Sequence, residues 1–192
     1  MKQPAMKQTA VKQGAMKHAP AANAHGFPPV ASPASRVLVL GSLPGQESLR
    51  RRHYYAHPRN AFWGIIERLF EIPATMAYAR RVAMLKRSGV ALWDVCAAAV
   101  RPGSLDGSIA PASVQPNDVA AFLASHPAIT LVCFNGAKAG ELFDRHVAAS
   151  RGVRRLLLPS TSPANATLSF RDKLQRWSVI RPGRAHGNRE LD

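Results

Sequence analysis

One short stretch of the chain, "LGSLPGQESLRRRHYYAHPRNAFW" at residues 40–63, concentrates the side chains that could do chemistry. It holds two glycines, a triple arginine, two tyrosines, two histidines and an asparagine between an apolar strand pattern and an apolar helix pattern. The stretch is not a phosphate-binding P-loop, because its glycines are one residue too close and Gln46 stands at the lysine position. Nor is it a dinucleotide fingerprint, since a proline and a single glycine replace the pattern G-x-G-x-x-G.

A metal site is the next candidate, because His53 and His57 are four residues apart. Asp94 and Asp106, in later loops, would add carboxylates. However, Pro58 moves His57 away from helical geometry, so the two imidazoles need not share a face. The chain also has no H-E-x-x-H motif and no clustered carboxylates. We therefore expect no metal and no cofactor, and we expect a histidine here to pack or hydrogen-bond locally.

The charge of the chain indicates its partner. It has 26 Lys and Arg against 11 Asp and Glu, a net charge of +15. This predicts a polyanion, with nucleic acid first and an anionic membrane surface second; an unspecialised basic surface is the third interpretation. No window approaches the roughly 18 apolar residues of a transmembrane helix, so we expect no membrane insertion.

The two cysteines indicate the compartment. Cys96 and Cys133 lie in apolar runs and are expected to pack as small core residues in a reducing environment. They are too few for an iron–sulfur cluster, which takes about four thiolates. We expect a cytoplasmic protein, associated with the nucleoid in a bacterium.

The elements that would position the polar stretch alternate along the chain. Short apolar runs, typical of strands buried on both faces, occupy residues 36–42, 89–96, 129–136 and 154–162. Helical patterns occupy residues 60–70, 117–126, 137–147 and 169–180. This alternation predicts an α/β fold, a three-layer α/β/α sandwich with a central, mainly parallel four-stranded sheet. The loops that follow its strands would converge at one edge, where such sheets bind ligands.

Composition divides the chain into three segments. Residues 1–35 carry lysines at positions 2, 7, 12 and 17, no acidic residue and mostly alanine as apolar residue. We predict a disordered basic N-terminal arm there, with an organellar transit peptide as the alternative. Residues 36–181 form the predicted folded domain, and residues 182–192 a flexible C-terminal tail.

Two motifs together resemble a known family. "GSLPG" with "YYAHPRNAFW", followed far downstream by "LPSTSPAN", is similar to the uracil-DNA glycosylase superfamily, in particular its mismatch-specific branch and the hypoxanthine (deoxyinosine) DNA glycosylase family. The resemblance covers roughly residues 36–180. Where the mismatch-specific branch carries a water-activating asparagine, this chain has Leu43. The hypoxanthine glycosylase family also lacks a polar residue there and uses the asparagine of the A-H-P-x-N segment, which is Asn60 here.

The resemblance implies a DNA repair enzyme. It would flip a deaminated base out of double-stranded DNA and hydrolyse its N-glycosidic bond, leaving an abasic site. Hypoxanthine is the expected base, with uracil or xanthine as alternatives. Neither motif has a lysine to form a Schiff base, so we expect a monofunctional glycosylase. We also expect the protein to be a monomer. Two other functions remain open, a non-catalytic nucleic-acid-binding module on the same scaffold and a metal-dependent nuclease.

The resemblance also implies residue roles. Asn60 would be catalytic, and Tyr55 would stack on the extruded base. From the residues themselves, the main-chain amides at Ser42 and Leu43 are candidates to contact the base edge, because Gly41 and Gly45 allow close backbone approach. Asn135 is a further candidate, since it ends a strand at the same edge of the sheet. The DNA would be contacted by Gly45, His57, Arg59, Ser160, Thr161 and Ser162.

Structural roles are open for the same residues. Asn60 would also serve as a helix N-cap worth about 1 kcal/mol, and the two roles are compatible. Tyr55 is alternatively a core tyrosine, and Asn135 a residue that ends a strand in a turn. The serine-rich segment is alternatively an ordinary turn. Asp94 could balance positive charge on the sugar.

Overall fold

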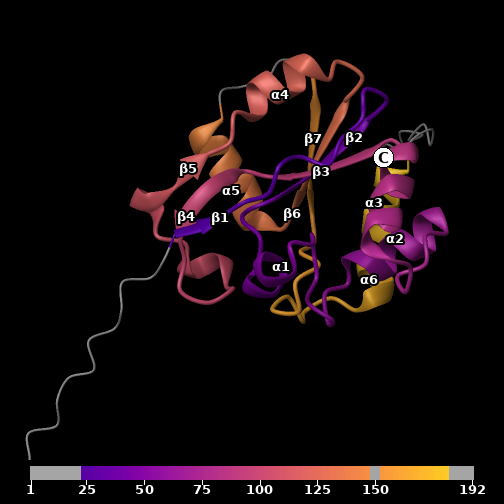
Figure 1. The fold of residues 1–192 in the computed structure, drawn as a ribbon, viewed down its shortest axis with the longest axis horizontal. Helices are drawn as coiled ribbons and strands as arrows, with labels where there is room; N and C mark the ends of the chain where they lie inside the picture. Colours follow the sequence, from indigo (N-terminus) through magenta and orange to yellow (C-terminus); the bar gives the residue numbers. More distant parts are fainter. Residues whose placement is uncertain (1–22, 148–151, 182–192) are drawn as a thin grey trace, which may run out of the picture.

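The four apolar runs form one central sheet in the computed structural model, which describes residues 23–147 and 152–181 (Figure 1). Its strands are β2 (Val37–Gly41), β3 (Val90–Asp94), β6 (Leu131–Asn135) and β7 (Arg154–Leu158). They lie in the order β3-β2-β6-β7, and each neighbouring pair is parallel. The predicted central, parallel, four-stranded sheet is confirmed.

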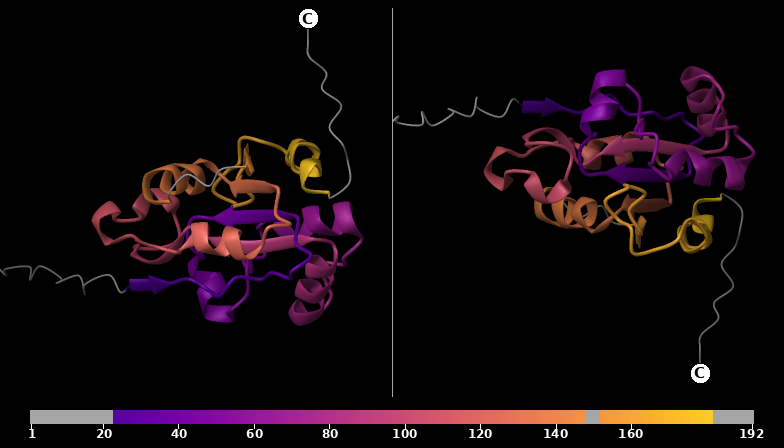
Figure 2. Two further views of the ribbon diagram at one scale, coloured as in Figure 1. Left: turned by 90° about the horizontal axis from the view of Figure 1, so that it is seen from above. Right: turned by 90° about the horizontal axis from the view of Figure 1, so that it is seen from below.

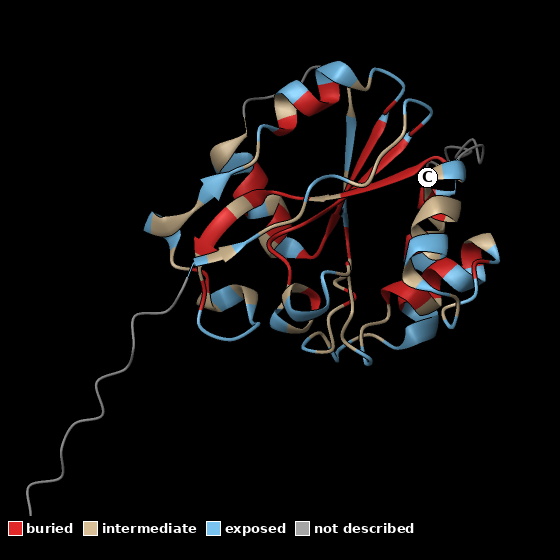
Figure 3. Cartoon of the chain, viewed as in Figure 1, coloured by how far each residue is buried: buried red, intermediate tan, exposed pale blue. Residues whose placement is uncertain are grey.

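Helices cover both faces of this sheet, which gives the predicted three-layer sandwich (Figure 2). One face carries α2 (Phe62–Phe70), α3 (Tyr78–Arg87) and α6 (Phe170–Trp177), and the other carries α4 (Val119–Ser125) and α5 (Ala137–His146). Strand β2 is buried along its whole length (Figure 3). Because successive strand residues point to opposite faces, Val37 and Val39 join one core and Leu38 and Leu40 the other.

Helix α2 is held firmly against the sheet, and this matters because it begins beside the polar stretch. Phe62 is fully buried and meets the ring of Trp177 on α6 edge to face, with ring centroids 5.8 Å apart. Burial of a side chain of this size is worth about 2 kcal/mol. The indole N–H of Trp63 donates to the carbonyl of Tyr54 at 2.9 Å, so the helix also fixes the loop before it.

A second, antiparallel sheet was not predicted. It consists of β1 (Asn23–His25), β4 (Cys96–Val100) and β5 (Gln115–Pro116), in the order β1-β4-β5. The predicted boundary of the N-terminal arm at residue 35 is therefore wrong. Residues 23–35 are folded: β1 pairs with β4, Val30 bridges to Leu92, and Phe27 packs against the core. Backbone pairing supplies the stabilisation that the composition of this segment does not indicate. Residues 1–22 of the predicted arm and the predicted tail, 182–192, lie outside the described residues.

Two helices were also missing from the prediction. Helix α1 (Gln46–Arg51) follows β2 directly, and α3 packs its one fully buried side chain, Leu85, beside β3. Short 3-10 turns, η1 (Asp106–Ser108), η2 (Pro111–Ser113) and η3 (Ser178–Ile180), complete the connections. Among the helices of residues 23–147 and 152–181, none is long and apolar enough to cross a membrane.

Candidate active site

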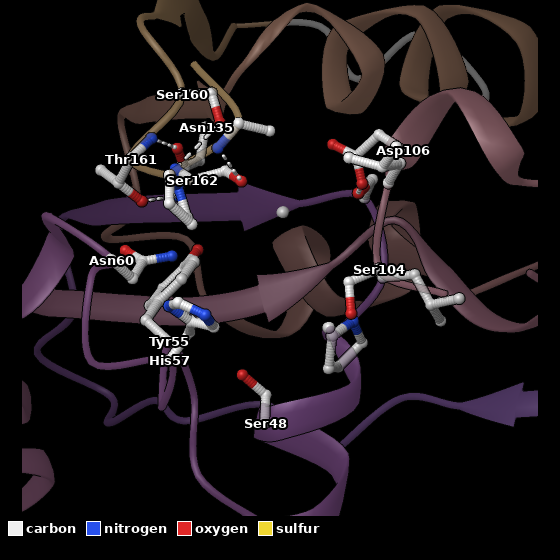
Figure 4. A pocket seen from close by; sticks show the side chains of 18 of the residues that line it. Ser48, Tyr55, His57, Asn60, Ser104, Asp106, Asn135, Ser160, Thr161 and Ser162 are labelled. Carbon is white, nitrogen blue, oxygen red and sulfur yellow. Dashed lines mark hydrogen bonds between the residues drawn. The ribbon is translucent and has the colours of Figure 1, made fainter. Parts of the chain in front are cut away.

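The carboxyl ends of the four central strands meet at one edge of the sheet, where they enclose a pocket of about 570 Å³ (Figure 4). Gly41, Asp94 and Asn135 end β2, β3 and β6, and Ser160 follows β7; all four residues line the pocket. This is the edge predicted from the parallel strand order. The volume lies in the range of small-molecule sites and accommodates a nucleobase.

Tyr55 forms one wall of the pocket in a strained conformation. Its backbone lies in the left-handed region, with φ at 56°, which costs a residue other than glycine about 1–3 kcal/mol. Phe62 packs against its ring, with centroids 4.0 Å apart. The phenol oxygen is buried and has no hydrogen-bond partner among the described residues. Burial, followed by the nearby charge of Asp94, raises the pKa of Tyr55 above its usual value of 10.0.

Asn60 lies beside the start of α2 with its amide in a fixed orientation. Its Oδ1 accepts a hydrogen bond from the backbone N–H of Phe62 at 2.9 Å. Because a backbone N–H can only donate, the atom that it meets must be the amide oxygen. The Nδ2 group is therefore turned toward Tyr55 and the pocket, as Figure 4 shows. The N-cap position itself is Ala61, so Asn60 stabilises the helix from one residue further out than predicted.

The loop after β2 presents its main chain to the pocket. The side chain of Leu43 is buried in the core, as its apolar character requires. The guanidinium of Arg101 donates to the carbonyl oxygens of Leu43, at 3.0 Å, and Pro44. The hydroxyl of Ser42 donates to Asp106 Oδ1 at 2.6 Å. Within the described residues, the amides of Ser42 and Leu43 make no hydrogen bond, which leaves them available as the sequence predicted.

Asp94 lies at the base of the pocket against Gly41. Its side chain is buried, and a Cβ atom on Gly41 would overlap Asp94 Oδ1. Glycine is therefore needed at position 41 for close packing of the two strand ends. Burial raises the pKa of Asp94 to about 7; a hydrogen bond from Tyr54 opposes the rise, and the negative charge of Asp106 adds to it.

Asn135 is tied to the serine-rich loop, residues 159–165. Its Nδ2 donates to Thr161 Oγ1 at 2.9 Å, and its Oδ1 accepts the backbone N–H of Thr161 at 2.8 Å. Thr161 is itself buried, and its carbonyl accepts the N–H of Ala61 at 3.0 Å. The side chain of Thr161 is thus held inside the protein, which differs from the phosphate contact predicted for it. Asn135 lines the pocket but uses both ends of its amide to hold the loop.

The rest of the serine-rich loop is held by its own contacts. Ser160 Oγ accepts the N–H of Ser162 at 3.2 Å, and Asn165 Nδ2 donates to the carbonyl of Ser160 at 3.1 Å. The ammonium of Lys173, a buried residue, donates to the carbonyl of Asn165 at 2.7 Å. Ser160 and Ser162 are half-buried at the pocket. Such a pre-formed loop can bind a ligand without losing much conformational freedom.

The mouth of the pocket opens beside a basic groove of about 720 Å³. Tyr55, His57 and Asn60 line both hollows, while Arg59 is exposed in the groove alone. His57 Nδ1 accepts the N–H of Arg59 at 3.1 Å. Gly45 lines the pocket, but a Cβ there would lie an ordinary 3.7 Å from Ser104, so its conformation does not demand glycine.

Comparisons with known proteins agree with this geometry. The model of the uracil DNA glycosylase superfamily matches residues 28–181. The chain belongs to this superfamily. A hypoxanthine DNA glycosylase of Methanosarcina acetivorans is 36% identical over 156 residues, which cover 81% of this chain and 96% of that protein. A hypoxanthine DNA glycosylase of Methanosarcina barkeri is 35% identical over 154 residues, which cover 80% of this chain and 94% of that protein. A solution NMR structure from M. acetivorans, provisionally named a uracil DNA glycosylase, superposes with a TM-score of 0.70 at 35% identity, over 83% of this chain and 98% of that one.

The protein is accordingly a DNA glycosylase, an enzyme that hydrolyses N-glycosyl bonds. Its predicted site residues all line the pocket except Arg59: Ser42, Leu43, Gly45, Tyr55, His57, Asn60, Asn135, Ser160, Thr161 and Ser162. The family match begins at residue 28, inside the segment predicted as an arm, which agrees with its folded state.

This glycosylase also has site residues whose importance the sequence did not reveal. Arg101 and Asp106 hold the loop after β2, and Asn165 and Lys173 hold the serine-rich loop. The contacts of Arg101 and Asp106 join segments about 60 residues apart, so no local pattern indicates them, whereas Asn165 and Lys173 hold their own neighbourhood and only the fold shows it. His53 stacks on Tyr78, with centroids 3.8 Å apart, and burial lowers its pKa. In the part of the chain that the structure describes, no three His, Cys, Asp or Glu residues group as metal ligands would.

Proposed function

We propose that this glycosylase removes hypoxanthine from deoxyinosine in double-stranded DNA. The observation that carries the proposal is Asn60, whose oxygen is fixed by the helix and whose Nδ2 donor is aimed into a nucleobase-sized pocket. Leu43, buried at the position of the water-activating asparagine in the mismatch-specific branch, leaves Asn60 as the polar side chain for that task. The names of both Methanosarcina relatives support hypoxanthine as the base.

Base release requires the nucleotide to leave the duplex. Extrusion costs a few kcal/mol and less when the base is mispaired, as hypoxanthine is opposite thymine. Stacking of the base on Tyr55 would offset about 1–3 kcal/mol of the free energy of extrusion. The packing of Phe62 on the other side of the Tyr55 ring would hold the ring in position for this stacking.

Bond cleavage then passes through a sugar with oxocarbenium character. The Nδ2 group of Asn60 would hold the attacking water at C1′, with the second lone pair of Oδ1 available to one of its protons. The free main-chain amides of Ser42 and Leu43 would donate to the edge of the base. Each of these donors is fixed beforehand, which is how electrostatic stabilisation of a transition state is obtained.

The groove beside the pocket supports double-stranded DNA as the partner. Among the described residues that line it, four are cationic and none is acidic: Arg51, Arg59, Arg81 and Lys173. The guanidinium of Arg81 lies 4.3 Å from the centre of the Trp63 ring, and its Nε is buried without a partner in this part of the chain. We infer that phosphates of the strand next to the flipped nucleotide occupy this groove.

One assay tests the activity. Labelled duplexes with a single hypoxanthine, uracil or xanthine are incubated with the protein and EDTA, and abasic sites are then cleaved with alkali. We expect hypoxanthine release that survives chelation. A requirement for metal would indicate a nuclease, and binding without release would indicate a passive module; either result would refute the proposal.

Two substitutions separate chemistry from helix capping. Asn60→Ser keeps an oxygen that can accept the Phe62 N–H but removes the amide donor, whereas Asn60→Ala removes both. We expect each to lower the single-turnover rate at least about 100-fold. Only Asn60→Ala should also lose about 1 kcal/mol of unfolding free energy. A fully active Asn60→Ser would reduce this residue to a cap.

A further inference from the structure

Three buried polar atoms lie at the base of the pocket with few hydrogen-bond partners among the described residues. They are Asp94 Oδ2, Tyr54 Oη and Tyr55 Oη; the contact of Tyr54 with the Asp94 carboxyl lowers the pKa of Asp94, but no hydrogen bond of normal geometry is made by any of the three atoms. All three residues line the pocket. Buried polar groups in native proteins are almost always paired, so a cluster of such incompletely paired atoms indicates a place for a polar ligand.

Gly41 brings the Asp94 carboxyl and the Tyr55 phenol close to one another at the end of β2. A Cβ atom there would overlap Asp94 Oδ1 and lie 3.6 Å from Tyr55 Oη. The carboxyl and the phenol therefore face the same bare stretch of backbone at the end of β2. Asp94 lines the pocket and is only 3% exposed.

The charged and titratable groups around Asp94 come from several elements. They are Tyr54 and Tyr55 before α2, Cys96 on β4, Arg101 after β4 and Asp106 on η1. Arg101 directs its guanidinium to the carbonyl oxygens of the loop after β2 and to that of Gly103, so Asp94 gains no ion pair from it. Asp106 adds a second negative charge nearby, and its Oδ1 is taken by Ser42. Burial and the charge of Asp106 therefore both disfavour the ionised form of Asp94.

We propose that Asp94 is the general acid that protonates the departing purine. The inference rests on the proposed function, because it requires a purine base that enters the pocket with the edge carrying O6 and N7 directed to Asp94. For a purine attached through N9, that edge carries O6 and N7, and N7 offers an in-plane lone pair. Tyr54 would supply a hydroxyl partner on the same edge.

The step balances in protons and electrons. The C1′–N9 bond breaks and its electron pair passes into the purine ring, while the proton on Asp94 moves to N7. Water held by Asn60 adds to C1′ and gives up one proton, which returns through solvent to the Asp94 carboxylate. One water is consumed, and hypoxanthine and an abasic site are formed.

The buried carboxyl has the acidity that this role needs. Its pKa is raised to about 7, first by burial, so a large fraction is protonated near neutral pH. A general acid works best when its pKa lies near the pH at which the enzyme operates. Asp94 therefore has both the position and the acidity of a proton donor to the base.

The test is the pH profile of single-turnover hypoxanthine release from pH 5.5 to 9. The wild-type rate should fall tenfold per pH unit well above pH 7, as Asp94 loses its proton. Asp94→Asn should lower the rate at pH 6 at least about tenfold and abolish this fall. Asp106→Asn, which removes a neighbouring charge but keeps an oxygen for Ser42, should move the fall to lower pH.

Each other outcome has a definite meaning. An Asp94→Asn protein that folds, binds DNA and keeps the wild-type rate and pH profile overturns the inference while leaving the proposed function intact. A wild-type rate that is flat or rises above pH 7 also overturns it. No hypoxanthine release by the wild-type protein at any pH would refute the proposed function instead. Urea unfolding of each variant shows whether a lower rate results from loss of the folded structure. If Asp94→Asn does not fold, Asp106→Asn decides: a fall of the rate at the same pH as in the wild type overturns the inference.

Discussion

Asp94 makes the stability of the folded protein depend on pH, whether or not the residue takes part in catalysis. Its pKa rises from an ordinary 3.8 to about 7 in the folded state, chiefly through burial. A raised pKa means that the folded protein holds this proton more tightly than the unfolded chain. The contribution is therefore fully present below pH 3.8 and is lost as the pH rises through about 7. Over that whole range it amounts to about 4 kcal/mol, of which about 2.5 kcal/mol is lost between pH 5 and pH 8.

Urea unfolding at pH 5 and pH 8 measures this difference, with Asp94→Asn as the matched variant. Asparagine has nearly the same shape and does not titrate, so the variant should lose less stability than the wild type between the two pH values, by about 2.5 kcal/mol. Other groups titrate in both proteins and cancel in the comparison. If the unfolding free energies of the two proteins depend on pH in the same way, the Asp94 carboxyl is solvated in the folded protein and its pKa is not raised.

Three further predictions concern the loops around the pocket. Asn135→Ala removes two buried hydrogen bonds to Thr161 and should lower the free energy of unfolding by about 2–4 kcal/mol, measured in urea; a loss below about 1 kcal/mol would mean that the clamp is unimportant. Gly136→Ala places a Cβ 2.9 Å from Ser160 Cβ at a φ of 98°, so it should cost about 1–3 kcal/mol and slow base release, and an unchanged single-turnover rate would contradict this. Arg59→Gln should weaken DNA binding at low salt and reduce the salt slope by about one phosphate contact without changing base preference, whereas an unaltered slope would remove Arg59 from the DNA interface.

The sequence predicted the sheet because its strands are buried on both faces and read as continuous apolar runs. Strand β1 could not be predicted in the same way. It spans only Asn23–His25, in alanine-rich surroundings, and exists because β4 offers a free edge. Helix α3 was missed because four of the ten residues in YARRVAMLKR are basic and only Leu85 is fully buried.

The candidate site was predicted where motifs are local, and missed where contacts are distant. Tyr55 and Asn60 fall within one short motif, and the structure places both at the pocket. The partnership of Asn135 with Thr161 joins residues 26 positions apart, so the sequence left the role of Asn135 open. The contact of Asp94 with Gly41 depends on the register of β2 and β3, which pairs these two residues only after the sheet has formed.

Thr161 connects the serine-rich loop, which would contact the DNA strand, with the segment that carries Asn60. Its side chain is fastened to the end of β6, and its carbonyl oxygen holds the N–H of Ala61, the residue that follows Asn60. A pull on the serine-rich loop by a DNA backbone would thus be transmitted through a single peptide unit to the amide at residue 60. One buried threonine therefore sets both the place where the strand would be held and the place where the hydrolytic water would be aligned.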